Sequence, residues 1–183
     1  MFEKYSRTGA SRNARMSLRF AFSSPAHVIA TFGGSGLLHP APGTWGTAAG
    51  LVVYIALERR IPLAGWIAIL LASFFLGAWA SHVTGKDMGV HDHGSIVIDE
   101  VAAIWLTLLT VPATLPWQIA AFVAFRFFDI VKLPPTGYFD ASERWKNGWG
   151  VMLDDVVAAV QAIGLLYAAR AQYINRKSST SRF

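Results

Sequence analysis

The sequence predicts an all-α protein, a membrane-embedded bundle of about five apolar helices. Apolar residues make up 54% of the chain and charged residues only 15%, against a usual charged share of about 25%. The mean hydropathy is +0.40. Residues 63–80 contain no charge and approach the roughly 20 apolar residues that cross a bilayer. These observations favour a membrane protein over a soluble one.

Five apolar segments predict the helices of the bundle. They are rich in Ala and Leu, continuous rather than alternating, and too long for ordinary strands. The first and fourth are short for a full crossing, so they would tilt, extend or enter partway, and the first is expected to be short or re-entrant. In chain order, the segments cover residues 44–57, 62–81, 96–112, 116–131 and 151–169.

One helical domain between two basic tails is the predicted organisation. The domain covers residues 27–169, the N-terminal tail residues 1–26 and the C-terminal tail residues 170–183. Much of the net charge of +5 lies in these tails, which could contact anionic lipid headgroups. No folded basic surface alternates with aromatic residues, so nucleic-acid binding is disfavoured. The chain has no cysteine, which excludes disulfides and thiolate ligands.

Short turns and two longer polar loops connect the segments. ERRIP and TVPATLP predict tight turns, whereas residues 81–94 and 132–150 predict longer loops, which often carry function. If successive segments run antiparallel, both long loops and the N-terminal tail lie at one end of the bundle. The Lys and Arg residues there indicate the cytoplasmic side. Five crossings would put the basic C-terminal tail on the other side, a conflict that a re-entrant first segment removes.

The same alternation gathers acidic residues at that end of the bundle. Five of the 11 acidic residues lie within or beside apolar segments. Acids that lie close together repel unless they are protonated or bridged by a cation, and Mg²⁺ prefers oxygen ligands. Salt bridges to Arg126, Lys132 or Lys146 would explain the acids without a metal. The predicted metal ligands are Asp99, Glu100, Asp129, Asp154 and Asp155.

Basic residues and a helix start are the predicted phosphate contacts. Arg126 and Lys132 would clamp an anion beside the metal, although Arg126 could simply pair with Asp129 at i, i+3. In the Gly/Pro-rich stretch 33–50, free backbone N–H groups at the helix start would favour a phosphate, although a tight entry turn is the simpler explanation. Pro42 and Gly43 set that turn, and Thr44 or Thr47 is the predicted N-cap.

The loop HDHGS contains His91, Asp92 and His93. It lacks the further nitrogen or sulfur ligands that a zinc site requires. His93 is a candidate for proton transfer or for a phosphate contact, and an ordinary polar surface loop is the alternative. No Gly-x-Ser-x-Gly elbow occurs, so a serine hydrolase is disfavoured.

Four blocks of the chain resemble the bacterial phosphatidylglycerophosphatase A family. They are GSGLLHPAPGTWGTAAG, GVHDHGSIVIDEVAAIWLTL, FRFFDIVKLPP and GWGVMLDDVVAAVQA, in matching order over roughly residues 27–169. The resemblance implies an enzyme, a Mg²⁺-dependent phosphatase of the bacterial inner membrane. Its substrate would be the lipid phosphatidylglycerophosphate, whose terminal phosphate is hydrolysed to give phosphatidylglycerol in phospholipid biosynthesis.

Carried over by position, the resemblance matches Asp99 and Glu100 to the family's Asp-Glu pair, Arg126, Asp129 and Lys132 to its FRxxDxxKP block, and Asp154 and Asp155 to its MxDD block. KLPP and NGWG depart from the family's usual Lys-Pro-Trp-Pro and Gly-Gly-x-Gly, and the sequence diverges after Asp140. These departures lie in the expected substrate loop rather than among the expected metal ligands. The predicted catalytic residues are Asp99, Glu100, Asp129 and Asp155. The predicted substrate-binding residues are Arg126, Lys132, Thr44, Gly43 and His93.

The predicted chemistry is metal-assisted hydrolysis of a phosphate monoester. One carboxylate would orient or deprotonate water, or a carboxylate would form an aspartyl-phosphate intermediate. A small membrane cation transporter or channel is the alternative from another class, because intramembrane acids also mark ion paths. That alternative would place the acids at differing depths along a pore, whereas helix alternation places them at one end.

Overall fold

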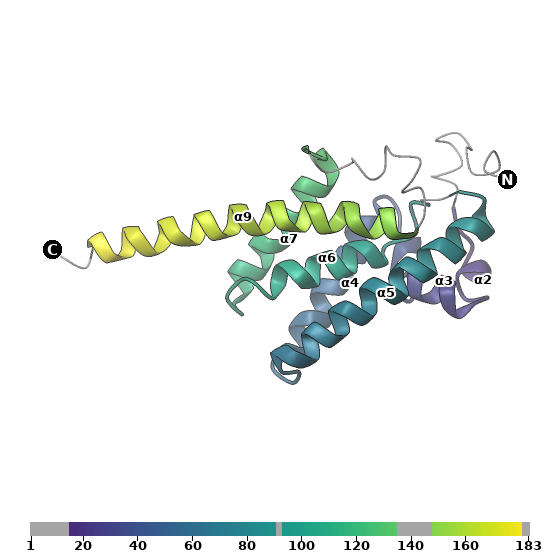
Figure 1. Cartoon of the computed structure of the whole chain (residues 1–183), viewed down its shortest axis with the longest axis horizontal. Helices are drawn as coiled ribbons and strands as arrows, with labels where there is room; N and C mark the ends of the chain where they lie inside the picture. The colour runs from purple at the N-terminus through teal and green to yellow at the C-terminus, as the bar shows by residue number, and fades with distance from the viewer. Residues whose placement is uncertain (1–14, 91–92, 135–147, 181–183) are drawn as a thin grey trace.

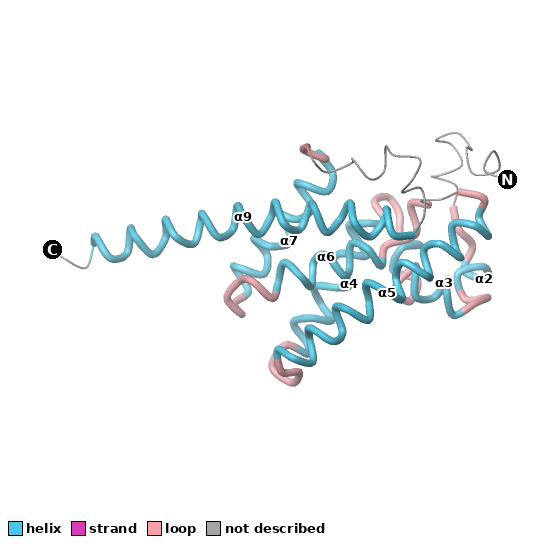
Figure 2. Tube along the Cα trace, in the orientation of Figure 1, coloured by secondary structure: helices cyan, strands magenta, loops and turns pink. Residues whose placement is uncertain are grey.

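The structure, a computed structural model, describes residues 15–90, 93–134 and 148–180, with side chains described as far as residue 175. All regular structure in these ranges is helical, as Figure 2 shows, and they contain no strand. The predicted all-α class is therefore confirmed for this part of the chain. The elements are α2 (Leu18–Ala21), α3 (Pro25–Ala30), η2 (Ser35–Leu37), α4 (Pro42–Leu57), α5 (Leu63–Met88), α6 (Ile98–Leu108), α7 (Leu115–Val131) and α9 (Gly148–Thr180).

Helix α6 is the centre of the bundle, and α4, α5, α7 and α9 all pack against it (Figure 1). Nearly all of its residues are buried, because apolar side chains occur around its whole circumference. Trp105 shows how α6 is tied to its neighbours: its Nε1 donates to the Gly50 carbonyl at 2.8 Å, and its ring meets those of Phe32 and Trp66 edge-on. The central helix therefore has little freedom to rotate or slide.

Glycines bring the backbone of α4 against α6. A Cβ added at Gly46 would lie 2.5 Å from the Val97 Cβ, and one added at Gly50 would lie 3.1 Å from the Ile104 Cγ2. The absence of side chains at these two positions allows the close approach. As a result, the start of α4 lies beside the start of α6.

Within the described residues, two helices, α5 and α9, are long and apolar enough to cross a membrane. Much of their apolar surface is exposed rather than packed inside the protein; on α5 the exposed row includes Leu63, Ile67, Leu71 and Phe75. Helices α4, α6 and α7 have 16, 11 and 17 residues, short of the roughly 20 that a full crossing takes. The embedding of about five helices therefore stays a prediction.

The helix ends differ from the sequence prediction at two places. Helix α5 continues to Met88 and stops at Gly89, which has a φ of 68°, so the predicted loop at residues 81–94 is mostly helix. Helix α4 begins at Pro42, before both threonines predicted to cap it. The prediction of a Thr44 or Thr47 cap was wrong because proline suits the first helical position, where its missing N–H costs nothing.

Short helices pack inside the stretch predicted as the N-terminal tail. Helices α2 and α3 start after Ser17 and Ser24, whose hydroxyls accept backbone N–H bonds. The buried His27 then joins α3 to the end of α5, with Nε2 3.0 Å from Asp87 Oδ2. The division into tails and a central domain stays a prediction, and residues 1–14 and 181–183 lie outside the described chain.

Helix directions alternate as predicted, so helix ends gather at one end of the bundle (Figure 1). The starts of α4 and α6 and the end of α7 meet there. The start of α9 lies against the second half of α5, where a Cβ on Gly148 would overlap the Ala78 carbonyl. Helices α4, α6, α7 and α9 therefore supply residues to a common region.

The close approach of α4 to α6 makes a testable prediction about two glycines. Gly46→Ala should lower the thermal unfolding midpoint in detergent, because overpacking a tight contact costs about 1–3 kcal/mol. Gly164→Ala is the matched control: apart from its chain neighbours and its own helix backbone, no atom of the described residues lies within 4 Å of its added Cβ, and alanine favours a helix by roughly 0.5–1 kcal/mol. A Gly46→Ala midpoint equal to or above that of Gly164→Ala would contradict the predicted contact.

Candidate active site

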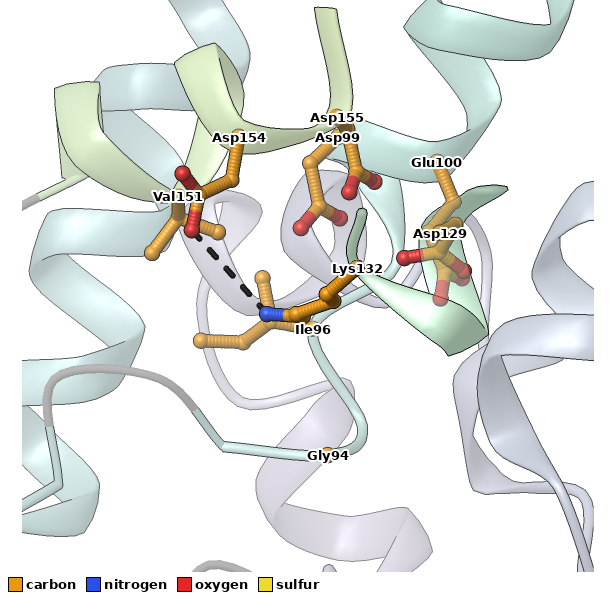
Figure 3. Close-up of a pocket in the computed structure, with 9 residues that line it drawn as sticks. All are labelled: Gly94, Ile96, Asp99, Glu100, Asp129, Lys132, Val151, Asp154 and Asp155. Atoms are coloured by element: carbon orange, nitrogen blue, oxygen red, sulfur yellow. Dashed lines mark ion pairs between the residues drawn. The ribbon is translucent and has the colours of Figure 1, made fainter. Parts of the chain in front are cut away.

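A polar pocket of about 200 Å³ opens where α6, α7 and α9 meet. Figure 3 shows acidic side chains from all three helices around one space, with Lys132 across from them. Gly94, Ile96 and Val151 complete the wall, so most of the lining is ionisable. The residues around the pocket are Gly94, Ile96, Asp99, Glu100, Asp129, Lys132, Val151, Asp154 and Asp155.

Three carboxylates in this pocket come close enough to share one cation. Oxygens of Glu100, Asp129 and Asp155 all lie within 4.8 Å of one another. Ligand oxygens around one Mg²⁺ lie roughly 3–4 Å apart, since each is about 2.1 Å from the ion. Asp99 and Asp154 line the same pocket beside this trio. The structure thus brings together all five acids that the sequence singled out, and their role as metal ligands stays a prediction.

Helix geometry explains how each pair of adjacent acids contributes side chains to the pocket. Asp99 and Glu100 occupy the first turn of α6, where the positive end of the helix dipole favours anionic side chains. Asp154 and Asp155 lie in the second turn of α9, which starts at Gly148. Adjacent residues diverge by about 100° around a helix, so the members of each pair reach different parts of the pocket.

Several carboxylate oxygens are buried without a hydrogen-bond partner among the described residues. They include Asp99 Oδ1, Glu100 Oε2 and Asp155 Oδ2. Such oxygens lose their hydration and gain nothing in return, which costs free energy unless a cation or water replaces the lost contacts. A hard divalent cation fits this donor set, because oxygen ligands and negative charge are what Mg²⁺ prefers.

Burial and mutual repulsion raise the pKa values of the acids on α6, which lies outside the two candidate spans. Burial is the largest cause for Asp99, and the neighbouring Glu100 charge raises the pKa further, well above its ordinary value. Burial also raises the pKa of Glu100, to about 7, even though Arg126 lowers it. Without a bound cation, the folded protein therefore favours protonated carboxyl groups.

Arg126 and Lys132 occupy different positions around the acids. Arg126 Nη1 lies 2.9 Å from Glu100 Oε1 and 2.5 Å from Asp129 Oδ2, so the i, i+3 ion pair is present. Lys132 ends α7 in the left-handed conformation, with a φ of 48°. Its side chain lines the pocket, where Nζ lies 3.9 Å from Asp154 Oδ2. Lys132 therefore faces the space that a ligand would occupy.

The remaining predicted substrate contacts lie around the pocket rather than in its wall. A Cβ on Gly43 would overlap the Glu100 carboxylate, so the first turn of α4 packs directly against this acid. Thr44 is partly exposed and does not line the pocket. His93 is buried, and its Nδ1 accepts the Ser95 N–H at 3.1 Å. Substrate binding by these three residues stays a prediction.

Sequence reasoning predicted Thr47 only as a cap and missed its contact with the site. Thr47 is fully buried, donates to the Gly43 carbonyl at 2.8 Å and accepts from Arg126 Nη1 at 3.4 Å. One sign of this contact was available in the sequence. Thr47 lies four residues after Gly43, and residues at i and i+4 share a helix face, so both could face the site. His91, Asp92, Asp140 and Lys146, which the sequence also raised, lie outside the described residues.

The fold and pocket define a helical protein with two apolar candidate spans and an acidic site suited to a cation. The chain also matches the model of the family described as Phosphatidylglycerophosphatase A, over residues 28–170. It is 43% identical over 152 residues to the Phosphatidylglycerophosphatase A of Haemophilus influenzae, covering 82% of this chain and 91% of that protein. The chain therefore belongs to the phosphatidylglycerophosphatase A family.

Two further relatives have similar coverage. The Phosphatidylglycerophosphatase A of Escherichia coli is 39% identical over 150 residues, covering 81% of this chain and 86% of that protein. A Putative phosphatidylinositol-3-phosphatase of Bacteroides thetaiotaomicron is 38% identical over 150 residues, covering 78% and 92%. No solved structure matches the chain significantly.

The crowding of acids predicts that removing one of them stabilises the metal-free protein. Asp155→Asn should raise the unfolding midpoint in detergent with a chelator, by removing repulsion from Glu100 and Asp129. The gain should be larger at pH 8 than at pH 5, because Glu100, whose pKa is about 7, is mostly neutral at pH 5. The free energy of unfolding of the metal-free parent protein should also fall as the pH rises from about 4.5 to 7. Over this range Glu100 loses its proton in the unfolded chain before it does so in the folded protein.

Asp87→Asn is the control for this measurement. Asp87 is half-exposed and pairs with His27 at the end of α5, apart from the crowded pocket. Its replacement should leave the midpoint unchanged or lower it. An Asp155→Asn protein that is less stable than its parent without metal would show that the acids do not repel one another.

Proposed function

We propose that the chain is a Mg²⁺-dependent phosphatase that hydrolyses the terminal phosphate of phosphatidylglycerophosphate to give phosphatidylglycerol. One observation carries the proposal: carboxylates from three helices, with oxygens within 4.8 Å of one another, face a lysine across a small pocket. Membership of the phosphatidylglycerophosphatase A family supports the substrate, since two relatives are named for that activity.

Each ionisable group of the pocket has a proposed role. Glu100, Asp129 and Asp155 would hold Mg²⁺, with Asp154 beside them; when bound, the ion supplies charge neutralisation at phosphate oxygens. Lys132 would bind the phosphate through a charge-assisted hydrogen bond. Asp99 would orient water and accept its proton, because its Oδ1 lacks a partner among the described residues and it lines the pocket.

A lipid substrate is compatible with the position of the pocket. The pocket lies at the end of the bundle, beside the start of α9, one of the two candidate spans. The acyl chains could then remain in the bilayer while the phosphate headgroup enters the site. We place the protein in the bacterial inner membrane with this end at the cytoplasmic face.

The positions of these acids are less consistent with a transporter or channel than with an enzyme. An ion path requires ligands at successive depths, whereas the starts of α6 and α9 and the end of α7 supply one compact group. Apolar residues such as Ile104 and Leu108 fill the rest of α6 and are fully buried. The described part of the bundle is therefore packed beyond the pocket.

An assay of phosphate release from purified phosphatidylglycerophosphate by the purified protein tests the proposal. The protein in detergent should release phosphate with Mg²⁺ and lose this activity with a chelator. Asp99→Asn, Asp129→Asn and Asp155→Asn should each lower kcat by about 100-fold or more, because each alters the charge at the reacting phosphate. Asp87→Asn should retain activity. Full turnover by all three folded variants would refute the assignment.

A second lipid belongs in the same assay. The Bacteroides thetaiotaomicron relative, 38% identical, is named Putative phosphatidylinositol-3-phosphatase, which makes phosphatidylinositol 3-phosphate the second lipid. Both lipids present a phosphate monoester to the same type of site, so kcat/KM should be compared for the two. A higher kcat/KM for phosphatidylglycerophosphate is expected, and the reverse order would reassign the headgroup while retaining the phosphatase chemistry.

Cysteine labelling tests the membrane orientation, since the chain has no cysteine of its own. Asn175 lies on α9, about 40 Å along the helix from Gly148 and the site, which exceeds a bilayer core of about 30 Å. A membrane-impermeant maleimide should therefore label Asn175→Cys from the periplasm and Arg19→Cys, on α2, from the cytoplasm. Labelling of both from the same side would show that α9 does not cross.

A further inference from the structure

We propose that Arg126 is a positioning residue that holds Glu100 and Asp129 in place from behind and does not contact the substrate phosphate. The sequence suggested the opposite role, an anion clamp shared with Lys132. The proposal rests on the proposed function, because it assigns Arg126 a part in that same site. It assigns Arg126 a structural role and Lys132 a contact with the ligand.

The position of the guanidinium is the first argument. Arg126 does not line the pocket, whereas both of its carboxylate partners and Lys132 do. Its side chain is 12% exposed, and Nη1 already lies 2.9 Å from Glu100 Oε1 and 2.5 Å from Asp129 Oδ2. The guanidinium therefore lies on the side of the two acids that faces away from the ligand space.

The first two turns of α4 close this region from the other side. Thr47 Oγ1 accepts from Arg126 Nη1 at 3.4 Å and is itself held by its bond to the Gly43 carbonyl. A side chain at Gly43 would overlap the Glu100 carboxylate. Glu100 is thus enclosed between the α4 backbone and Arg126, which leaves its carboxylate little freedom to change orientation.

Charge balance explains why Arg126 is unsuited to binding substrate. Glu100 and Asp129 are largely buried and repel each other, and the shared arginine offsets that repulsion. If Arg126 swung toward a phosphate, it would leave two desolvated carboxylates without their partner, which is costly. Lys132 is better placed for the phosphate, because its side chain is 43% exposed and lines the pocket.

A comparison of Arg126→Gln with Lys132→Gln in the full-length protein in detergent tests the proposal. Arg126→Gln should weaken Mn²⁺ binding, followed by electron paramagnetic resonance, by about 10- to 100-fold, as expected when a support of metal ligands is removed. It should lower kcat and leave unchanged both the KM for phosphatidylglycerophosphate and the inhibition constant of inorganic phosphate. Lys132→Gln should instead raise that KM and inhibition constant.

Two more variants keep the test decisive if Arg126→Gln folds poorly. Arg126→Lys retains a cation and should recover part of the Mn²⁺ affinity. Thr47→Val removes one hydrogen bond to Arg126 at similar volume and should shift Mn²⁺ affinity and kcat in the same direction as Arg126→Gln, by less. Arg170→Gln, at an exposed position on α9, is the control and should change none of these quantities.

The outcomes separate this proposal from the proposed function. An Arg126→Gln or Arg126→Lys protein with unchanged Mn²⁺ affinity but a raised KM and phosphate inhibition constant would make Arg126 a substrate ligand and overturn the positioning role. If the parent protein bound no Mn²⁺ and needed no divalent metal, the proposed metal would fail. The role of Arg126 would still be decided by the Arg126→Gln protein: a lowered kcat with an unchanged phosphate inhibition constant indicates positioning, and a raised inhibition constant indicates substrate binding.

Discussion

The concentration of negative charge in one buried pocket is the constraint that organises this protein. Five carboxylates from three helices line about 200 Å³, and several of their oxygens have no partner among the described residues. Such a group is stable only if its carboxyl groups are protonated or positive charge lies close by. Arg126 provides it behind the acids, Lys132 provides it across the pocket, and the remaining oxygens suit a divalent cation. The chemistry proposed for the site follows from the same imbalance of charge.

The close packing of the helices keeps these acids near one another. Glycines at positions 43, 46 and 50 let α4 approach α6 closely, and Gly148 lets α9 start against the backbone of α5. Larger residues at these positions would separate the helix ends and hence the acids. Rigid helices rather than long loops therefore hold the charged groups, which favours a fixed geometry for a bound ion.

Particular residues show where sequence reasoning succeeded and where it stopped. Asp99, Asp129 and Asp155 could be grouped in advance, because alternating helix directions place them at one end of a bundle. The i, i+3 spacing likewise anticipated the pair of Arg126 with Asp129. Salt bridges from Arg126 to the acids were raised as an alternative, but the choice of Glu100 as a partner could not be predicted, since the rotation of α6 relative to α7 depends on packing. The length of α5 was also missed, because small polar residues such as Ser81 and Thr84 resemble a loop in sequence while they are buried within a helix.

The sequence by itself determined the helical class, the family and the set of acids, because these depend on composition, apolar run length and the order of local motifs. Only the tertiary structure decided which cation faces the pocket and which lies behind it. That distinction depends on how each helix is rotated about its axis, and side-chain packing across the whole bundle sets those rotations. Arg126 and Lys132, six positions apart in one sequence block, consequently lie on different sides of the same carboxylates.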